Sequence, residues 1–95
     1  MTEFRDLTDD QRFEQTFDDA DGNPARVWAD YAVQGGRRSI LHVEAEDALR
    51  GSGAAGRFMQ ALADHARAES LKLSPRCSYA VAWFKRHKDY DDVLA

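Results

Sequence analysis

The segment at residues 49–58, LRGSGAAGRF, has the residue types and spacing of a loop that binds a phosphate group. Residues 51–56 fit G-x-G-x-x-G, in which glycines let a backbone approach the pyrophosphate of a dinucleotide. Residues 50–55 also fit [Q/R]-x-x-G-x-[G/A], the pattern of a loop that binds the pyrophosphate of an acyl-CoA. The two patterns predict different chemistry, so the surrounding sequence must decide between them.

The dinucleotide pattern fails on its context. It requires a strand directly before the first glycine, a parallel strand after the helix, and an acid about 20 residues further on. Here the polar stretch EDALR, residues 46–50, separates the preceding strand pattern from Gly51, and the next strand pattern ends in Pro75-Arg76-Cys77 without an acid. A Walker A loop is also excluded, because no Lys-Ser or Lys-Thr pair follows the last glycine.

The acyl-CoA pattern requires only a strand, a turn of small residues and a helix directly behind it. Main-chain N–H groups of such a turn, together with the unpaired first amides and positive dipole end of the helix, attract an anion. Arg50 can add a charge-assisted hydrogen bond. The alternative is a flexible linker before a capped helix. The predicted pyrophosphate-binding residues are Arg50, Gly51, Ser52, Gly53, Ala54 and Ala55.

The elements around this loop predict an α+β domain with a mostly antiparallel sheet and the order β-β-β-α-β-α. Strand patterns cover residues 12–17, 25–33 and 37–45, and Gly35-Gly36 closes a hairpin between the last two. The spacing then changes to about 3.6 residues, which predicts a helix to Arg67. A short strand within residues 70–78 and a helix from about Ser78 to Lys88 follow. The polar residues 2–10 are expected to be loose.

Alternation along the returning strand, residues 37–45, predicts which side chains share a face. Leu41, Val43 and Ala45 are expected on one side of the strand. The other side is expected to carry Ile40, His42 and Glu44. This strand precedes the glycine loop, so its side chains are candidates for chemistry beside a bound acyl group.

Composition limits the class of protein. The chain has 95 residues, 43% of them hydrophobic, which suits one compact domain over residues 1–95. Its net charge of -4 disfavours nucleic acids and acidic membranes as partners. One cysteine permits no internal disulfide, and no zinc pattern or apolar leader is present. We therefore expect a cytoplasmic protein without a metal, either a monomer or a weak homodimer.

In this order and spacing, the motifs resemble the GCN5-related N-acetyltransferases, especially a small single-domain branch with a cysteine after the last strand. The resemblance spans nearly all of residues 12–94 and is carried by His42-Val43-Glu44, Leu49-Arg50-Gly51-Ser52-Gly53, the helix to Arg67, Pro75-Arg76-Cys77, Arg86-His87 and Tyr90. It implies acetyl-CoA (coenzyme A) as cofactor, with pyrophosphate over residues 50–55 and pantetheine beside residues 42–45. It also implies acetyl transfer to an amine that the sequence does not identify.

Four positions depart from the pattern of that branch. It usually has a basic residue at Ser52, a threonine at Val43, a tyrosine at Trp83 and a proline at Lys88. If the family tyrosine acts as a general acid for the leaving thiolate, an indole cannot replace it. Either another group such as Tyr79 supplies the proton, or thiolate release needs no acid.

Acetyl transfer to an amine requires a polarised carbonyl and a route for one proton. The resemblance suggests that main-chain amides near Val43 and Ala45 polarise the carbonyl. Glu44 or His42 could accept the proton directly or through water. The alternative for both is an ordinary surface position on the less buried side of the strand.

Cys77 has three interpretations: a nucleophile that carries the acetyl group, a packing residue beside the thioester, or an inert core residue. We favour packing beside the cofactor. Arg76, Lys85, Arg86 and His87 would lower its pKa if they face it. The rival to an acetyltransferase is a non-catalytic module that binds CoA or another protein.

Overall fold

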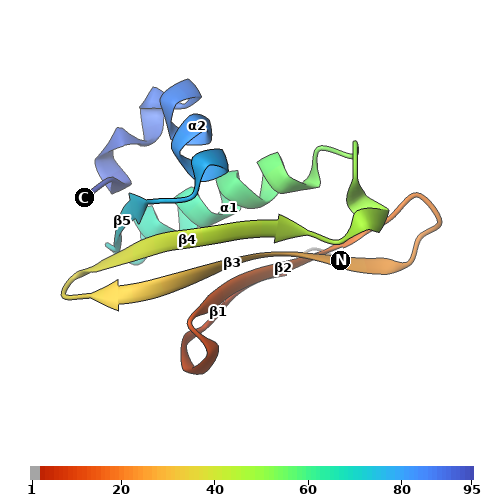
Figure 1. Ribbon diagram of the computed structural model, residues 1–95, viewed down its shortest axis with the longest axis horizontal. Coiled ribbons are helices and arrows are strands. Elements are labelled where there is room, and N and C mark those ends of the chain that lie inside the picture. The colour runs from red at the N-terminus through yellow and green to blue at the C-terminus, as the bar shows by residue number, and fades with distance from the viewer. Residues whose placement is uncertain (1–2) are drawn as a thin grey trace.

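Strand alternation and helical periodicity produce five strands and two α-helices over residues 3–95, the part of the chain that this computed structural model describes (Figure 1). The strands are β1 (Phe4–Leu7), β2 (Arg12–Asp18), β3 (Pro24–Gln34), β4 (Arg37–Ala45) and β5 (Lys72–Pro75). The helices are α1 (Ala54–Ala68) and α2 (Ser78–Arg86), with 3-10 turns at Thr8–Asp10, Asp47–Leu49 and Lys88–Val93.

The sheet has the strand order β1-β2-β3-β4-β5 and is antiparallel except between β4 and β5. This confirms the predicted α+β class and mostly antiparallel sheet. Gly35 adopts φ 65° in the β3–β4 hairpin, a left-handed conformation that glycine adopts without strain. Figure 1 shows α1 and α2 on the same side of the long strands.

The prediction of a loose N-terminal segment is wrong from Phe4 onward, because Phe4–Leu7 forms the edge strand β1. Contacts from distant residues hold this polar strand. Asp6 accepts hydrogen bonds from the Tyr31 hydroxyl (2.6 Å) and from Arg38. Burial and the Asp6 carboxylate raise the pKa of Tyr31 to about 12. Thr2, which the same prediction included, lies outside the described residues.

A β-bulge in β4 changes which of its side chains lie on each face of the sheet, compared with the prediction from the sequence. The register shifts so that Tyr31 pairs with Ile40, whereas the preceding residue, Asp30, pairs with His42. Leu41 is the extra residue, and half of its surface is exposed. Ile40 therefore lies in the core with Val43 and not opposite it, because one inserted residue reverses the alternation on one side of the bulge.

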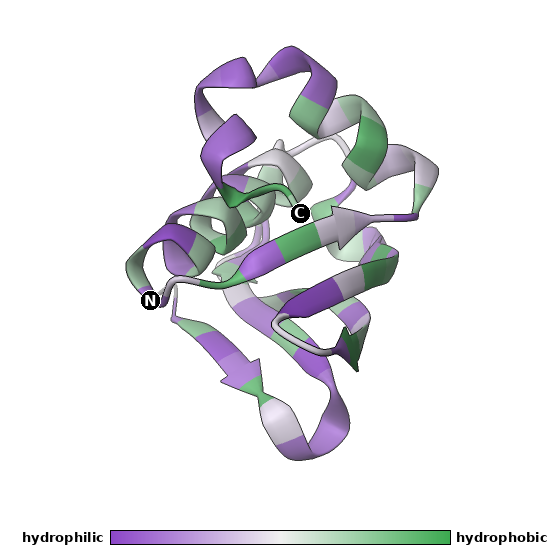
Figure 2. Cartoon of the chain, turned by 90° about the vertical axis from the view of Figure 1, so that its left-hand side faces the viewer, coloured by the Kyte–Doolittle hydropathy of each residue, from purple (hydrophilic) through white to green (hydrophobic). Residues whose placement is uncertain are grey.

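The core lies between the sheet and the helices. In Figure 2, hydrophobic and hydrophilic residues alternate along the strands, which leaves one face of the sheet polar. The fully buried large side chains are Phe13, Phe58, Ile40, Met59, Leu62, Leu73, Val27 and Val93. Within residues 3–95, no helix has the length and apolar character needed to cross a membrane.

Candidate functional site

The glycine loop between β4 and α1 has the backbone conformation of an anion-binding turn. Gly51 and Gly53 both have positive φ, 76° and 81°, and Gly53 is the N-cap of α1. The Ser52 hydroxyl donates to the Leu49 carbonyl (2.6 Å) and accepts from the Ala54 amide (3.1 Å). The serine that replaces the family's usual basic residue thus fixes the shape of the loop.

The loop leaves several main-chain donors available. Among the residues that the structure describes, no acceptor is recorded for the amides of Gly51, Gly53, Ala55 and Gly56. The Arg57 amide, by contrast, already donates to the Gly53 carbonyl at 3.2 Å. Free amides at the start of a 15-residue helix, together with its dipole, favour an anion at this position.

A groove of about 430 Å³ adjoins the loop and runs between α1 and α2. We call it the interhelical groove, and its lining residues are Gly53, Gly56, Arg57, Gln60, Trp83, Arg86 and His87. The α1 residues of this lining lie one helical turn apart, which places a polar stripe on one face of the helix. Sequence analysis did not assign Arg57 or Gln60 to the site, although this stripe begins at the glycine loop.

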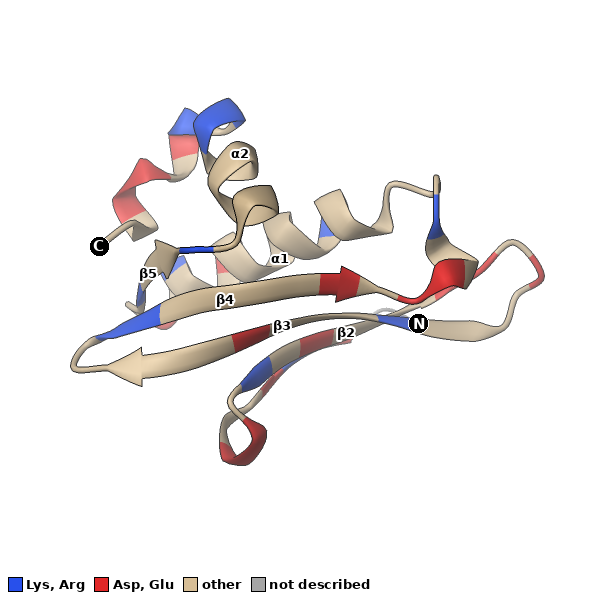
Figure 3. Cartoon of the chain, in the orientation of Figure 1, with Lys and Arg blue, Asp and Glu red and all other residues tan. Residues whose placement is uncertain are grey.

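Basic side chains surround the loop and the interhelical groove. In Figure 3, Lys and Arg positions are coloured on the loop, on α1 and at the end of α2. Arg50 is largely exposed and pairs with Asp47 at 3.2 Å. Arg57 donates to the Ser52 carbonyl at 3.2 Å and stacks over the Phe17 ring. Arg50 therefore lies beside the loop as predicted, and Arg57 is a second cation there.

The second half of β4 has a free edge on the side of β5. β5 pairs only with residues 37–40, and the amides of Arg76 and Cys77 then donate to the Ile40 carbonyl. The chain continues from there into α2, so no strand within residues 3–95 pairs with residues 41–45 on that side. Because alternate amides of a strand point the same way, Val43 and Ala45 present their N–H groups to one edge.

Cys77 lies at this free edge, at the N-cap of α2. Burial raises the pKa of the Cys77 thiol, but hydrogen bonds from the main-chain N–H groups of Ala80, Val43 and Tyr79 outweigh it, so the pKa is lowered. Main-chain donors at a helix start cause this shift, whereas the expected contribution from the cations of residues 85–87 is not among its causes. The amide of Val43 is therefore close enough to the sulfur to affect its pKa.

His42 and Glu44 lie side by side on the polar face of β4. Their side chains are about half exposed, and His42 Nε2 lies 3.8 Å from Glu44 Oε1. Cross-strand pairing places Asp30 beside His42 and Trp28 beside Glu44. Both side chains are accessible to water and flank Val43 in sequence, and no other side chain in the described part of the chain forms a hydrogen bond with them.

Tyr79 lies in the first turn of α2, two residues after Cys77, and is about one-third exposed. Burial is the largest cause of its raised pKa, against which the nearby Arg86 acts. The phenol is protonated near neutral pH already at its ordinary pKa of about 10, so it can donate a proton or a hydrogen bond. Tyr79 is therefore the phenol that could supply an acid near Cys77.

Trp83 occupies a core position and not an exposed catalytic one. It is 5% exposed and stacks on His87 with ring centroids 3.9 Å apart. Tyr90, which also matched the family pattern, donates its hydroxyl to Asp64 at 2.7 Å. These two aromatic side chains join α2 and the C-terminal turn to α1, and they explain why this segment is tightly packed.

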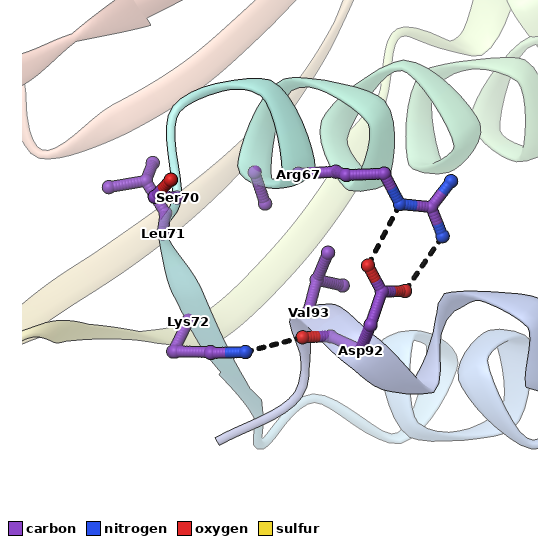
Figure 4. A pocket seen from close by; sticks show the side chains of 7 residues that line it. Arg67, Ser70, Leu71, Lys72, Asp92 and Val93 are labelled. Carbon is purple, nitrogen blue, oxygen red and sulfur yellow. Dashed lines mark hydrogen bonds and ion pairs between the residues drawn. The ribbon is translucent and has the colours of Figure 1, made fainter.

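A second cavity, of about 190 Å³, lies at the C-terminal end of α1 (Figure 4). Arg67 forms two hydrogen bonds with Asp92, at 2.9 and 2.7 Å, and Lys72 donates to the Asp92 carbonyl. Arg67 also donates to the Asp89 carbonyl at 2.8 Å. The charged side chains of this cavity are paired with one another or with main-chain carbonyls, so they connect α1, β5 and the C-terminal turn.

Comparisons with known proteins agree with this architecture. A family model described as GCN5-related N-acetyl-transferase matches residues 12–93. The NMR solution structure of a GCN5-like protein from Staphylococcus aureus is 26% identical, with a TM-score of 0.65, and the match covers 98% of this chain and 87% of that chain. A search of curated proteins gives no significant match.

Proposed function

Since the chain belongs to the GCN5-related N-acetyltransferase family, we propose that it transfers the acetyl group of acetyl-CoA to an amine. The observation that best supports this activity is the set of free amides in the loop before α1, next to the free edge of β4. The loop can bind a diphosphate, and the edge can bind an extended chain that carries amide groups. Acetyl-CoA supplies both of these groups and an activated acetyl thioester.

The residues proposed to hold acetyl-CoA follow from the donors that the chain leaves free. The amides of Gly51, Gly53 and Ala55 bind the diphosphate, and Arg50 adds a positive charge. The Ser52 hydroxyl and the Ala54 amide, which bond to each other, keep the loop in shape. Because the loop already presents these donors, little reorganisation is required on binding.

At the edge of β4, the amides of Val43 and Ala45 are the proposed donors to the reacting acyl group and its arm. A donor aimed at a developing oxyanion contributes more in a partly desolvated site than in water. The amide of Val43 is among the groups that lower the pKa of Cys77, so the sulfur lies close to this proposed donor. We place Cys77 there as a packing neighbour, and its lowered pKa makes a thiolate route a second possibility to test.

His42 and Glu44 are the proposed acceptors of the amine proton, because they flank Val43 and face solvent on the polar side of β4. Tyr79 is the proposed donor to the leaving thiolate, because its phenol is protonated at neutral pH and lies on the first turn of α2. The acceptor amine approaches over the polar sheet face, which no helix covers in residues 3–95.

The function is tested by offering acetyl-CoA with a panel of small amines and lysine peptides and measuring the release of free CoA thiol. We expect thermal stabilisation by CoA and amine-dependent release. Glu44→Gln or His42→Gln should reduce kcat by about a hundredfold, as for loss of a general base. Glu14→Gln, on the same sheet face but two strands away, is the matched control and should leave kcat unchanged.

Two other outcomes contradict the proposal, one by excluding catalysis and the other by excluding CoA binding. Stabilisation by CoA without release of thiol for any amine indicates a non-catalytic CoA-binding module. Absence of stabilisation at saturating CoA rejects both functions. The role of Cys77 is read from intact mass after incubation with acetyl-CoA: an unchanged mass supports packing, whereas an acetyl adduct that is absent in Cys77→Ala supports a covalent intermediate.

A further inference from the structure

Glu46, the residue directly after β4, joins the end of this strand to β3 through both its main chain and its side chain. Its amide donates to the Arg26 carbonyl at 3.0 Å. In return, the Arg26 amide donates to Glu46 Oε2 at 2.6 Å, and Arg26 Nε donates to the same oxygen at 3.3 Å. The last regular pair of these strands is Val27 with Ala45, so the carboxylate accepts a main-chain N–H beyond the end of the ladder.

A continuous series of hydrogen bonds leads from Glu46 to the first turn of α1. The Glu46 carbonyl accepts from the Leu49 amide at 2.9 Å, and the Leu49 carbonyl accepts from the Ser52 amide at 3.1 Å and hydroxyl at 2.6 Å. The Ser52 hydroxyl in turn accepts from the Ala54 amide at 3.1 Å. Leu49 is also buried in the core. The glycine loop is therefore linked through Glu46 to β3, which pairs with β4 on the side away from its free edge.

Glu46 lies between the two parts of the proposed acetyl-CoA site. The proposed donors to the acyl group, the amides of Val43 and Ala45, precede it, and the proposed diphosphate donors within residues 51–55 follow it. The diphosphate and the acetyl thioester are at opposite ends of one arm, so the placement of the loop decides where the thioester lies along β4. A misplacement of about 1 Å can lower the rate of a reaction by about a hundredfold.

We propose that Glu46 is a positioning residue, whose carboxylate fixes the glycine loop relative to the edge of β4 and so places the acetyl group beside Val43. This proposal rests on the proposed function and adds to it a residue that acts without touching acetyl-CoA or the amine. The bonds within the loop do not involve the carboxylate, since Ser52 forms them with Leu49 and Ala54. Loss of the carboxylate should therefore misplace the acetyl group and leave the diphosphate site intact.

The test separates kcat from the affinity for CoA in three variants. Glu46→Ala leaves the Arg26 amide without this acceptor, and we expect kcat to fall about tenfold, with the Kd of CoA changed by no more than about threefold. Glu46→Gln keeps an oxygen that can accept from the amide and should restore kcat to within about threefold of wild type. Asp19→Ala is the matched control, because Asp19 Oδ1 accepts from the amides of Asp21 and Asn23 in the β2–β3 turn. This control should lower the Tm about as much as Glu46→Ala and leave kcat unchanged.

A second measurement requires neither acetyl-CoA nor an amine. Amide hydrogen exchange followed by NMR should be faster at Arg26, Leu49 and Ser52 in Glu46→Ala than in the wild-type protein, because the carboxylate no longer holds this end of the sheet to the loop. Exchange at the same amides should be unchanged in Asp19→Ala. A contribution to stability alone would lower the Tm of both variants and the kcat of neither.

Three outcomes would overturn the positioning role while leaving the proposed function intact. Wild-type kcat in Glu46→Ala is the first. A parallel fall in kcat and CoA affinity is the second, because Glu46 would then shape the diphosphate site itself. An equal loss of kcat in Glu46→Gln is the third, because the charge and not the hydrogen bond would then be required. Absence of thiol release by the wild-type protein rejects the proposed function, and unchanged exchange at Leu49 and Ser52 in Glu46→Ala then rejects the positioning role as well.

Discussion

The two ends of α1 border cavities with opposite hydrogen-bonding character. At the N-terminal end, the amides around Gly53 lack recorded acceptors among the described residues, and the interhelical groove opens beside them. At the C-terminal end, Arg67, Lys72 and Asp92 are bonded to one another or to main-chain carbonyls (Figure 4). A satisfied end stabilises the fold, whereas an end with free donors is available to a ligand.

The largest effect on CoA affinity is expected from a substitution in the glycine loop at the N-terminal end of α1. Gly53→Val places a β-branched residue at φ 81° and distorts the amides that follow it. We expect CoA affinity to fall by about a hundredfold or more, equivalent to about 3 kcal/mol of lost charge-assisted hydrogen bonds. Calorimetric titration measures the affinity, and the variant should remain folded.

The matched control for this substitution is Gly22→Val. Gly22 also has φ 81°, but it lies in the turn between β2 and β3 and has open space around it. The Gly22→Val variant should lose about as much thermal stability as Gly53→Val, and its affinity for CoA should be unchanged. If the two variants bind CoA equally well, the loop is not the anion site, and the contrast between the ends of α1 has no functional meaning.

A smaller effect, on stability alone, should follow at the C-terminal end. Tyr90→Phe removes the hydroxyl that donates to Asp64 at 2.7 Å and leaves the ring in place. We expect a loss of about 1 kcal/mol, or a fall in Tm of about 5 °C, with CoA affinity unchanged. Thermal denaturation and titration measure the two quantities. A clear loss of CoA affinity would show that this end also shapes the ligand site.

The smallest effect should come from Asp92→Asn, and it should depend on pH. Hydrogen bonding to Arg67 lowers the pKa of Asp92 below its ordinary value of 3.8. The pKa of Asp92 is lower in the folded state than in the unfolded state. The ion pair therefore stabilises the fold at pH values above the unfolded-state pKa, and this stabilisation is lost as the pH falls through the folded-state pKa. The Tm of the variant should be slightly lower than that of wild type at pH 7, and this difference should shrink as the pH falls below 3.8. A constant difference across that range would contradict the assignment.

Sequence patterns predicted the strands β2, β3 and β4 and both helices, because each has a periodicity that indicates a buried face, and they also predicted the short strand β5 within residues 70–78. They missed β1, since its four residues are stabilised by Tyr31 and Arg38 from distant strands. They also missed the bulge at Leu41, because an inserted residue leaves no local mark on an apolar strand. Both features depend on pairing between strands, which alternation along one strand does not contain.

The candidate site also has one part that the sequence could predict and another part that it could not. The loop at Gly51 and Gly53 was predictable, because left-handed backbone requires glycine and the pattern lies directly before a helix. The part formed by Arg57 and Arg86 was not, because it exists only where two helices distant in sequence meet. The roles proposed for His42, Glu44 and Cys77 stay predictions that the variants above address, and the role proposed for Tyr79 also stays a prediction.

The contrast between the two ends of α1 is tested most directly by titrating ¹⁵N-labelled protein with CoA and following backbone amide resonances. We predict the largest shifts at Gly51, Gly53, Ala55 and Gly56, whose amides have no recorded acceptor in the described chain. Residues 70–72 at the other end should be unaffected. Shifts concentrated at residues 70–72, with the loop amides unchanged at saturation, would contradict the account.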